Sequence, residues 1–392
     1  MITGSKELIR DINSNLVLET IINSQPISRA SISKRLGLTK ATISAIVQDL
    51  INKNLVIEIG SDDTSLGRKP ILLNFNKKAG YAISIDLGVE TISVLLTDLQ
   101  GEDCTLRQIK TPSKPSDITG VLIQIIEAMI PTKGHYPYGL VGISIGIHGV
   151  VHNNDISFAP YYNLVGLGLK EKLEQHFHTK VFLENEANLS VLGEKTFMYD
   201  YPNIANISVH SGIGLGIIIN NSLYTGYNGR AGEFGHTIIE IDGRECPCGN
   251  HGCLEQYVSE RVILREFLEL KGLNSNELDT PLSIDTLVSM YQTGDVLAIQ
   301  IIDRFIKYMS ICINNVLNAY NPNIVIINSS FTIYLPELIT RIEHTLSSKM
   351  NSVTSILPSA LQDTSILLGG ISVVIKDFLG IRILRLQNNE LK

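Results

Sequence analysis

The sequence predicts an α/β protein with a small, mainly helical domain at its N-terminus. Residues 1–78 contain apolar repeats of helical period separated by turn residues, whereas strand and helix patterns alternate from residue 79 onward. A short segment around residue 250 is rich in His and Cys. These observations divide the chain into an N-terminal domain at 1–78 and a larger α/β domain at 79–392.

Charge is divided unevenly along the 392 residues. Residues 1–78 contain eleven Lys and Arg against seven Asp and Glu, a net charge of +4, and the remainder contains 21 against 32, a net charge of −11. A basic N-terminal domain on an acidic body favours a polyanionic partner for that domain alone. Residues 1–7 lack the apolar core of a secretory signal. We therefore expect a cytoplasmic protein with no membrane partner.

The first two helices of the N-terminal domain are predicted from apolar spacing and capping. The apolar positions of the first helix are Leu16, Val17, Ile21 and Ile22. Pro26 ends that helix, and Ser28 is placed to cap a second helix over residues 29–36. Gly37 then supplies a turn, which gives the first half of a helix-turn-helix.

A third helix follows, and its two faces differ. Thr39 is placed as its N-cap. Its apolar face consists of Ile43, Ile46, Val47 and Leu50, which leaves Lys40, Thr42, Ser44 and Gln48 pointing away from the core. In a helix-turn-helix, such a helix lies in the DNA major groove. The candidate DNA contacts on these helices are Ser28, Arg29, Thr39, Lys40, Thr42 and Ser44.

Residues 54–58 and 71–75 are predicted strands that would form a wing. The tip between them carries Arg68 and Lys69, two further candidate DNA contacts. A guanidinium on a loop tip suits a narrow, A/T-rich minor groove. The alternative is a three-helix packing module with a solvated hairpin.

The α/β domain contains a repeated pattern. Strands are predicted at 81–86 and 91–97, and again at 204–209 and 217–219, with a glycine-rich link before the last. Helices are predicted at 118–129, 169–177, 186–197 and about 295–320. The repetition indicates a duplicated α/β unit of two lobes, an architecture that binds ligands between its lobes.

A His and three Cys within eighteen residues predict a metal site. The four residues are His236, Cys246, Cys248 and Cys253. Three thiolates and one imidazole complete the tetrahedral shell of Zn²⁺ and leave no position for a reactive water, so we expect a structural zinc knuckle. The alternative is a set of unrelated buried cysteines around a turn. Cys104 and Cys312 lie outside this set and are expected in the core.

Two motifs resemble the signature of the ROK family, which comprises repressors, open reading frames and sugar kinases. They are Gly226-x-x-Gly229-x-Ala231-Gly232-Glu233-Phe234-Gly235-His236 and Cys246-Pro247-Cys248-Gly249-x-x-Gly252-Cys253-Leu254-Glu255. The resemblance covers essentially the whole chain and implies a two-lobed actin-like (RNase H-like) sugar-binding fold. Together with the N-terminal winged helix-turn-helix, it implies a repressor that responds to xylose.

Comparison with the kinase members of this family favours a non-enzyme. Where those kinases have Asp-x-Gly-Gly-Thr, this chain places Val89 and Glu90, a bulky residue and an anion, near the phosphate position. The segment 210–212 departs in part from their Gly-Thr-Gly, and 328–330 replaces a Gly-Gly pair with side chains. His148, which stands where the kinases usually have Pro, is expected to be a solvated loop residue.

The residues expected to bind the sugar are better retained. Glu186 replaces the catalytic Asp, and the added methylene displaces the carboxylate by about 1.5 Å, which costs a base its alignment but not its ability to bind. The resemblance implies six sugar-binding residues: Asn163, Asn185, Glu186, Glu233, His236 and Glu255. Several anionic and neutral acceptors suit a free sugar and disfavour a phosphorylated one. His236 is expected to hold zinc with one nitrogen and a sugar hydroxyl with the other.

We therefore expect a DNA-binding transcriptional repressor of xylose-utilisation genes, released from operator DNA by free xylose. It would act as a homodimer or a dimer of dimers on a palindromic operator. Three alternatives stay open at this point: a ROK sugar kinase, a repressor that responds to glucose or an N-acetylglucosamine derivative, and a repressor controlled by a protein partner.

Overall fold

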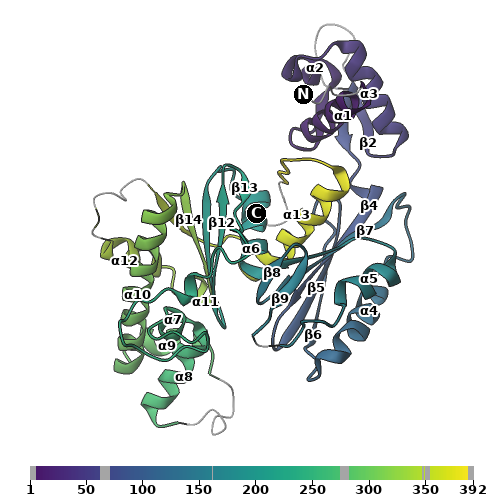
Figure 1. Ribbon diagram of the computed structural model, residues 1–392. Coiled ribbons are helices and arrows are strands. Elements are labelled where there is room, and N and C mark those ends of the chain that lie inside the picture. The colour runs from purple at the N-terminus through teal and green to yellow at the C-terminus, as the bar shows by residue number, and fades with distance from the viewer. Residues whose placement is uncertain are drawn as a thin grey trace. The chain divides into compact units, whose positions relative to one another are not determined.

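The computed structural model describes residues 6–61, 71–160, 162–273, 282–346, 348 and 354–386 (Figure 1). The chain forms two compact units. Unit 1 consists of Met1–Glu184 together with Leu367–Lys392, and unit 2 is Asn185–Ile366. The chain therefore crosses between the units twice, after Glu184 and after Ile366. Among the helices of the described ranges, none combines the length and apolarity that a membrane crossing requires.

Residues 6–75, called the head below, form three helices and a small sheet. The helices are α1 (Lys6–Ile22), α2 (Arg29–Leu36) and α3 (Lys40–Asn52). The sheet is antiparallel with the order β1-β3-β2, built from Ile27–Ser28, Ile71–Phe75 and Val56–Ser61. The side chains of Ser28 and Thr39 accept hydrogen bonds from the backbone amides of Ser31 and Thr42, so both predicted N-caps are confirmed.

The core of the head follows the predicted apolar faces, with one exception. Ile43, Ile46, Val47 and Leu50 of α3 are buried, and so are Val17, Ile21 and Ile22 of α1. Leu16 was expected among them but is 41% exposed. Because neighbours in a helix are turned by about 100° from each other, Val17 takes the inward position and Leu16 does not. Arg68 and Lys69 lie outside the described residues.

Unit 1 contains a five-stranded sheet with the order β10-β7-β4-β5-β6. Strand β4 pairs antiparallel with β5 and parallel with β7. The bounds are β4 Gly80–Leu87, β5 Thr91–Asp98, β6 Thr105–Lys110, β7 Gly139–Ile147 and β10 Val181–Asn185, with a small hairpin of β8 Val150–His152 and β9 Asp155–Phe158.

Unit 2 contains a second sheet with the order β13-β12-β11-β14-β15. In chain order within each unit, both sheets read 3-2-1-4-5, and in both the first two strands form an antiparallel hairpin. The predicted duplication is confirmed. The bounds are β11 Ile204–Val209, β12 Ile213–Ile219, β13 Ser222–Leu223, β14 Ile324–Ser329 and β15 Ser355–Pro358.

Alternate residues of the first sheet pack against different helices. Ile83 and Ile143 join one apolar cluster with helices α4 (Ile118–Met129) and α5 (Leu169–Phe177). On the other face, Ser84 and Ser144 lie against Gly370 of helix α13 (Ser365–Leu379). Figure 1 shows α13 and the pair α4 and α5 on opposite sides of this sheet. The strand period of two therefore produces an apolar face and a small-residue face.

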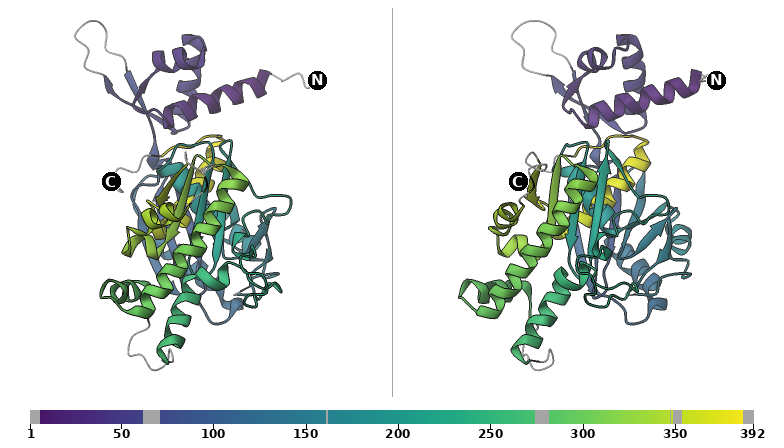
Figure 2. Two further views of the ribbon diagram at one scale, coloured as in Figure 1. Left: turned by 90° about the vertical axis from the view of Figure 1, so that its left-hand side faces the viewer. Right: turned by 60° about the vertical axis from the view of Figure 1, so that its left-hand side comes forward.

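The second sheet is also covered on both faces. Helix α6 (Glu186–Phe197) packs on β11 and β12, while the long helix α10 (Val296–Tyr320) joins the main apolar cluster on the other face. The long green helix of Figure 2 is α10. The remaining helices of this unit are α7 Glu255–Val258, α8 Glu260–Lys271, α9 Ile284–Gln292, α11 Ser330–Tyr334 and α12 Leu338–Thr345.

Two sequence expectations need correction here. Strand β12 begins at Ile213, not at Ile217, because Gly214 and Gly216 are strand residues that let α6 approach closely. Cys104 is exposed, whereas Cys312 is buried as expected. The described helices at 118–129, 169–177 and 186–197 match their predicted bounds.

Candidate functional site

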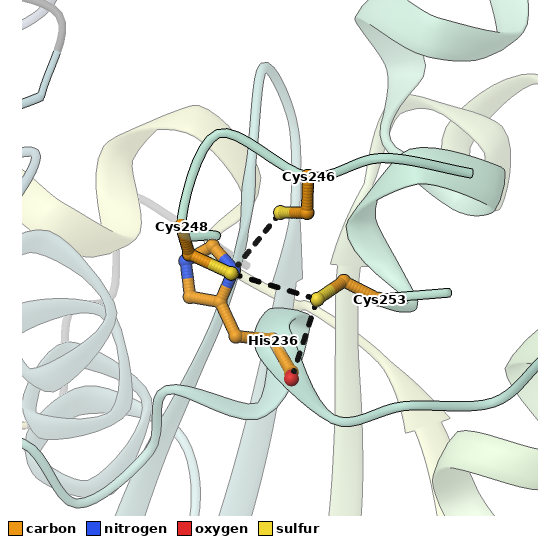
Figure 3. A group of neighbouring side chains, drawn as sticks. All are labelled: His236, Cys246, Cys248 and Cys253. Carbon is orange, nitrogen blue, oxygen red and sulfur yellow. Dashed lines mark hydrogen bonds between the residues drawn. The ribbon is translucent and has the colours of Figure 1, made fainter. Parts of the chain in front are cut away.

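The four predicted metal ligands come together in unit 2 (Figure 3). Their ligand atoms all lie within 4.8 Å of one another. His236 is the last residue of a 3-10 helix (Phe234–His236), and the three Cys come from the loop before α7. Sγ of Cys246 lies 3.6 Å from Nδ1 of His236, and Sγ of Cys248 lies 3.6 Å from Sγ of Cys253.

These distances fit a tetrahedral zinc site. With Zn–S bonds of about 2.3 Å and Zn–N bonds of about 2.0 Å, the edges of a tetrahedron are about 3.5 to 3.8 Å long. Burial raises the pKa of Cys246, and that of Cys253 to about 12, so thiolates at these two positions require a neighbouring cation. The donor set, its spacing and its partial burial therefore suit a metal ion with a closed shell.

Ion pairs fix the cysteine loop to the helices of unit 2. The guanidinium groups of Arg244 and Arg304 both contact the carboxylate of Glu266, at 3.0 Å and 2.6 Å respectively. Arg244 also donates to the carbonyl oxygen of Gln256 at 2.8 Å. Since Glu266 belongs to α8 and Arg304 to α10, the loop is attached to two helices beside the metal ligands.

The predicted sugar-binding residues of unit 2 surround the start of β12. The buried carboxylate of Glu255 accepts a hydrogen bond from the backbone amide of Ile213 at 3.2 Å. A Cβ on Gly214 would lie 3.2 Å from Oε1 of Glu186. The segment that carries Glu233 also packs here, because the backbone of Gly232 abuts the carbonyl oxygen of Leu215. Residues distant in sequence therefore converge on the first residues of one strand.

Asn185 has a structural role as the N-cap of helix α6. Its Oδ1 accepts hydrogen bonds from the backbone amides of Ala187 and Asn188, which caps helix α6. Its Nδ2 donates to Oε2 of Glu186 at 2.7 Å. Asn185 therefore orients the carboxylate of Glu186, and it lies at the first residue after the chain crosses into unit 2.

His236 turns its two ring nitrogens to different partners. Nδ1 faces Cys246, and Nε2 lies 3.9 Å from Oε2 of Glu233. Burial raises the pKa of Glu233, the nearby charges of His236 and Arg230 lower it, and Glu255 raises it further. One imidazole thus joins the metal cluster to the acidic residues near β12. Asn163, the sixth predicted sugar residue, is exposed in unit 1.

A buried carboxylate contacts the end of β14, in the segment 328–330 where the sequence departs from the kinase pattern. Glu260 accepts hydrogen bonds from Oγ of Ser329 at 3.0 Å and from the backbone amide of Ser330 at 2.7 Å. Burial raises the pKa of Glu260, and nearby His210 lowers it. The Asn328 side chain is buried and bonded to Oγ of Ser365. Glu260 was not predicted from the sequence, because it is 69 residues away from Ser329 in the chain.

His148 also differs from its expectation as a solvated loop residue. Its Nε2 lies 2.9 Å from Oδ1 of Asp86, and both side chains are about one fifth exposed. Asp86 begins the segment that departs from the kinase pattern. A histidine therefore engages the carboxylate that stands at this position, and Val89 and Glu90 after it are exposed.

In the head, Lys40 and Ser44 are exposed on α3, and Thr42 is half-buried with its hydroxyl 2.8 Å from that of Thr39. Arg29 has a partner within the head, since its guanidinium lies 2.6 Å from Glu58 of β2. Lys40 and Ser44 thus stay accessible, whereas Ser28 and Thr39 serve as N-caps.

Two sheets of identical strand order and a Cys₃His cluster define the class of this molecule, a duplicated α/β protein with an N-terminal helical head. The family model described as the ROK family matches residues 82–377. The chain belongs to the ROK family, as its two motifs predicted.

The proteins to which this chain is similar include both transcriptional regulators and a kinase. The xylose repressor of Bacillus spizizenii is 37% identical over 386 residues, which cover 96% of this chain and 98% of the repressor. A crystal structure of a ROK family transcriptional regulator, a homologue of the E. coli MLC protein, matches with a TM-score of 0.78 and 26% identity over 95% of this chain and 96% of its own. A ROK family glucokinase from Streptomyces griseus, in complex with glucose and AMPPNP, shares the fold at 24% identity and a TM-score of 0.65, over 75% of this chain and 99% of its own.

Proposed function

We propose that this chain is a transcriptional repressor of xylose-utilisation genes that free xylose releases from operator DNA. The observation that carries the proposal is its similarity to a xylose repressor over 96% of its length, which includes the head as well as the ROK domain. The shared architecture of a ROK family transcriptional regulator supports it independently. The boundary between the two functional domains is proposed near residue 78.

The head is proposed to be a winged helix-turn-helix. Helix α3 would lie in the major groove, with Lys40, Thr42 and Ser44 toward DNA, and Arg68 and Lys69 would extend the contact from the wing. The capping of α2 and α3 and the exposure of Lys40 and Ser44 support this assignment. A homodimer or dimer of dimers would place two heads on the half-sites of a palindromic operator.

The ROK domain, with its two actin-like (RNase H-like) lobes, is proposed to bind free xylose. Glu186, Glu233, His236 and Glu255 would accept or donate hydrogen bonds to sugar hydroxyls, and Asn163 and Asn185 are proposed as further sugar-binding residues. The convergence of Glu186, Glu233, His236 and Glu255 on the start of β12 supports this proposal. Zn²⁺ held by the Cys₃His cluster would be structural and would fix the orientation of His236.

We further propose that the chain binds sugar without phosphorylating it. Phosphoryl transfer requires room for the phosphates and donors that cradle them. In unit 2, the carboxyl group of Glu260 already accepts a hydrogen bond from the backbone amide of Ser330, so this amide is not available to a phosphate oxygen. In unit 1, exposed Glu90 adds negative charge where the kinases have Thr.

Two measurements separate this proposal from the kinase alternative. Isothermal titration with free xylose, glucose and N-acetylglucosamine should show binding of xylose with the highest affinity. A coupled assay with ATP and each sugar should detect no sugar-dependent ADP. Turnover at ordinary kinase rates, of about 1 to 100 per second, would show that the chain is an enzyme. Absence of heat with every sugar would indicate control by another ligand or by a protein.

A further inference from the structure

The last described residues of the chain are hydrogen-bonded to the first helix of the head. After α13 ends at Leu379, the tail, defined as residues 380–386, runs along α1. Oε2 of Glu19 accepts hydrogen bonds from the backbone amides of Arg382 at 2.9 Å and Ile383 at 3.1 Å. These contacts join segments more than 360 residues apart in the sequence.

Two asparagines extend the same contact. Asn23 donates to the carbonyl oxygen of Ile383 and accepts from the backbone amide of Arg385, both at 2.9 Å. Asn15 donates to the carbonyl oxygen of Gly380 at 2.9 Å. Asn15, Glu19 and Asn23 are spaced by four residues, so they lie along one line of α1 and its end. We call these five hydrogen bonds the clasp.

The tail also buries apolar side chains. Ile381, Leu384 and Leu386 are each at most 6% exposed, so apolar burial accompanies the clasp. Gly380 has a φ of +61°, and a Cβ there would lie 3.1 Å from Nδ2 of Asn15. A glycine therefore permits both the turn that ends α13 and the close approach of α1.

Helix α13 reaches the head at a second point. The ring of Phe378 packs edge-on against Tyr138, with centroids 5.0 Å apart. The hydroxyl of Tyr138 donates to the carbonyl oxygen of Lys53, the residue that follows the proposed recognition helix α3. The end of α13 thus contacts both α1, through the clasp, and the end of α3, through Tyr138.

The other end of α13 belongs to unit 2. Oγ of Ser365 lies 2.9 Å from Oγ of Ser190 and accepts from Asn328 at 3.0 Å, and all three residues belong to unit 2. The chain passes from unit 2 to unit 1 inside α13, after Ile366. Its other crossing lies directly before Asn185 and Glu186. A movement of one unit relative to the other must be taken up at these two crossings, one beside proposed sugar residues and one in the helix that holds the head.

We infer that α13 and the clasp fix the orientation of the head and transmit the sugar-bound state of the ROK domain to it. Glu19 and Asn23 are thus positioning residues for DNA binding, although they lie outside α3. This inference rests on the proposed function, because it names the route by which xylose would change operator affinity. Gly370 of α13 is in close contact with Ser84 and Ser144 of the first sheet. Because of this close packing, α13 cannot slide freely along the sheet, and we expect it to move as a rigid element.

The test compares full-length Glu19→Ala/Asn23→Ala with wild type. Operator affinity is measured by fluorescence anisotropy with and without saturating xylose, and xylose affinity by calorimetry. Couplings between sites in proteins are typically about 5- to 150-fold, so xylose should weaken operator binding of the wild type by a factor in this range. In the double variant that factor should fall below about 2, with xylose affinity unchanged. An undiminished factor would overturn the inference.

Two further variants serve as controls. Asp11→Ala removes an exposed carboxylate from the same helix that has no hydrogen bond with the described tail, and it should respond as the wild type does. Glu19→Gln keeps an acceptor oxygen, so it should retain an intermediate response. Loss of the response in Asp11→Ala as well would contradict a specific role of the clasp.

Failure of the proposed function is distinguishable from failure of the clasp. If xylose does not release wild-type protein from the operator, the proposed function is wrong, and amide hydrogen exchange decides about the clasp. Exchange at Arg382, Ile383 and Arg385 should be at least about 10-fold faster in the double variant than in Asp11→Ala, because these amides lose their acceptors. Equal exchange rates would show that the clasp does not hold the tail.

Discussion

Nδ2 of Asn185 donates to Oε2 of Glu186 at 2.7 Å while Oδ1 of the same side chain caps the helix that Glu186 begins. One amide therefore fixes both the start of α6 and the direction of the carboxylate proposed to bind sugar. These two residues directly follow the crossing of the chain from unit 1 into unit 2.

The two roles of Asn185 can be separated by substitution. Asn185→Ala removes the cap and should lower the free energy of unfolding by about 0.5 to 2 kcal/mol, measured by urea denaturation. Asn185→Asp keeps a capping oxygen, so its stability should stay within about 0.5 kcal/mol of wild type. It nevertheless replaces the donor to Glu186 by a second anion and should weaken xylose binding. Wild-type xylose affinity in Asn185→Asp would show that the contact does not orient a sugar ligand.

Glu186→Ala should abolish release from the operator by xylose and leave operator affinity without sugar unchanged, because Glu186 lies outside the head. Loss of a hydrogen bond to a charged acceptor costs about 1.5 to 3 kcal/mol, which corresponds to a xylose affinity about ten- to a hundredfold weaker. Calorimetry measures the xylose affinity, and fluorescence anisotropy measures operator affinity and its change with xylose. A normal xylose response in this variant would place the sugar site elsewhere.

Removal of one cysteine from the Cys₃His cluster should lower both the bound zinc and the response to xylose. Cys248→Ser is expected to lose bound zinc, measured by atomic absorption, and to unfold at a lower temperature, because structural zinc contributes folding free energy directly. Its xylose response should weaken, since His236 loses a fixed orientation. Cys104→Ser changes an exposed cysteine outside the cluster and should keep wild-type metal content. A metal-free Cys248→Ser with normal stability and response would show that the cluster has no structural role.

Lys40→Ala tests the assignment of α3. If Lys40 contacts a DNA phosphate, the slope of log K against log salt concentration should decrease in magnitude by about 0.9, and affinity should fall similarly for all operator sequences. Lys133→Ala removes a positive charge that is also exposed but lies outside the head, and it serves as the matched control. Equal salt slopes for Lys40→Ala and wild type would remove this side chain from the interface.

Local signals account for what the sequence predicted well. The described bounds of α2, α4, α5 and α6 agree with prediction because each helix has a capping residue, a turn or an apolar period nearby in the chain. The Cys₃His cluster was predictable for the same reason, since its four ligands lie within eighteen residues.

The missed features depend on packing between distant segments. Gly214 and Gly216 suggested a loop, yet they extend β12, because a Cβ on Gly214 would lie only 2.7 Å from Cβ of Ala187 in α6. The contacts of Glu260 with Ser330 and of His148 with Asp86 join residues 70 and 62 positions apart. In the clasp, Arg382 contacts Glu19, 363 positions away in the chain. No periodicity or motif in the sequence predicts such pairs, so they can be identified only from the fold.

The most direct test of the account is operator binding by the full-length protein as free xylose is added, with glucose and xylose 5-phosphate in parallel. Binding in the absence of sugar, followed by release with xylose but not with the phosphorylated sugar, is the predicted result, because acidic side chains surround the proposed site. Operator affinity that does not change with xylose, or protein that binds no operator at all, would contradict the assignment of this chain as a xylose-responsive repressor.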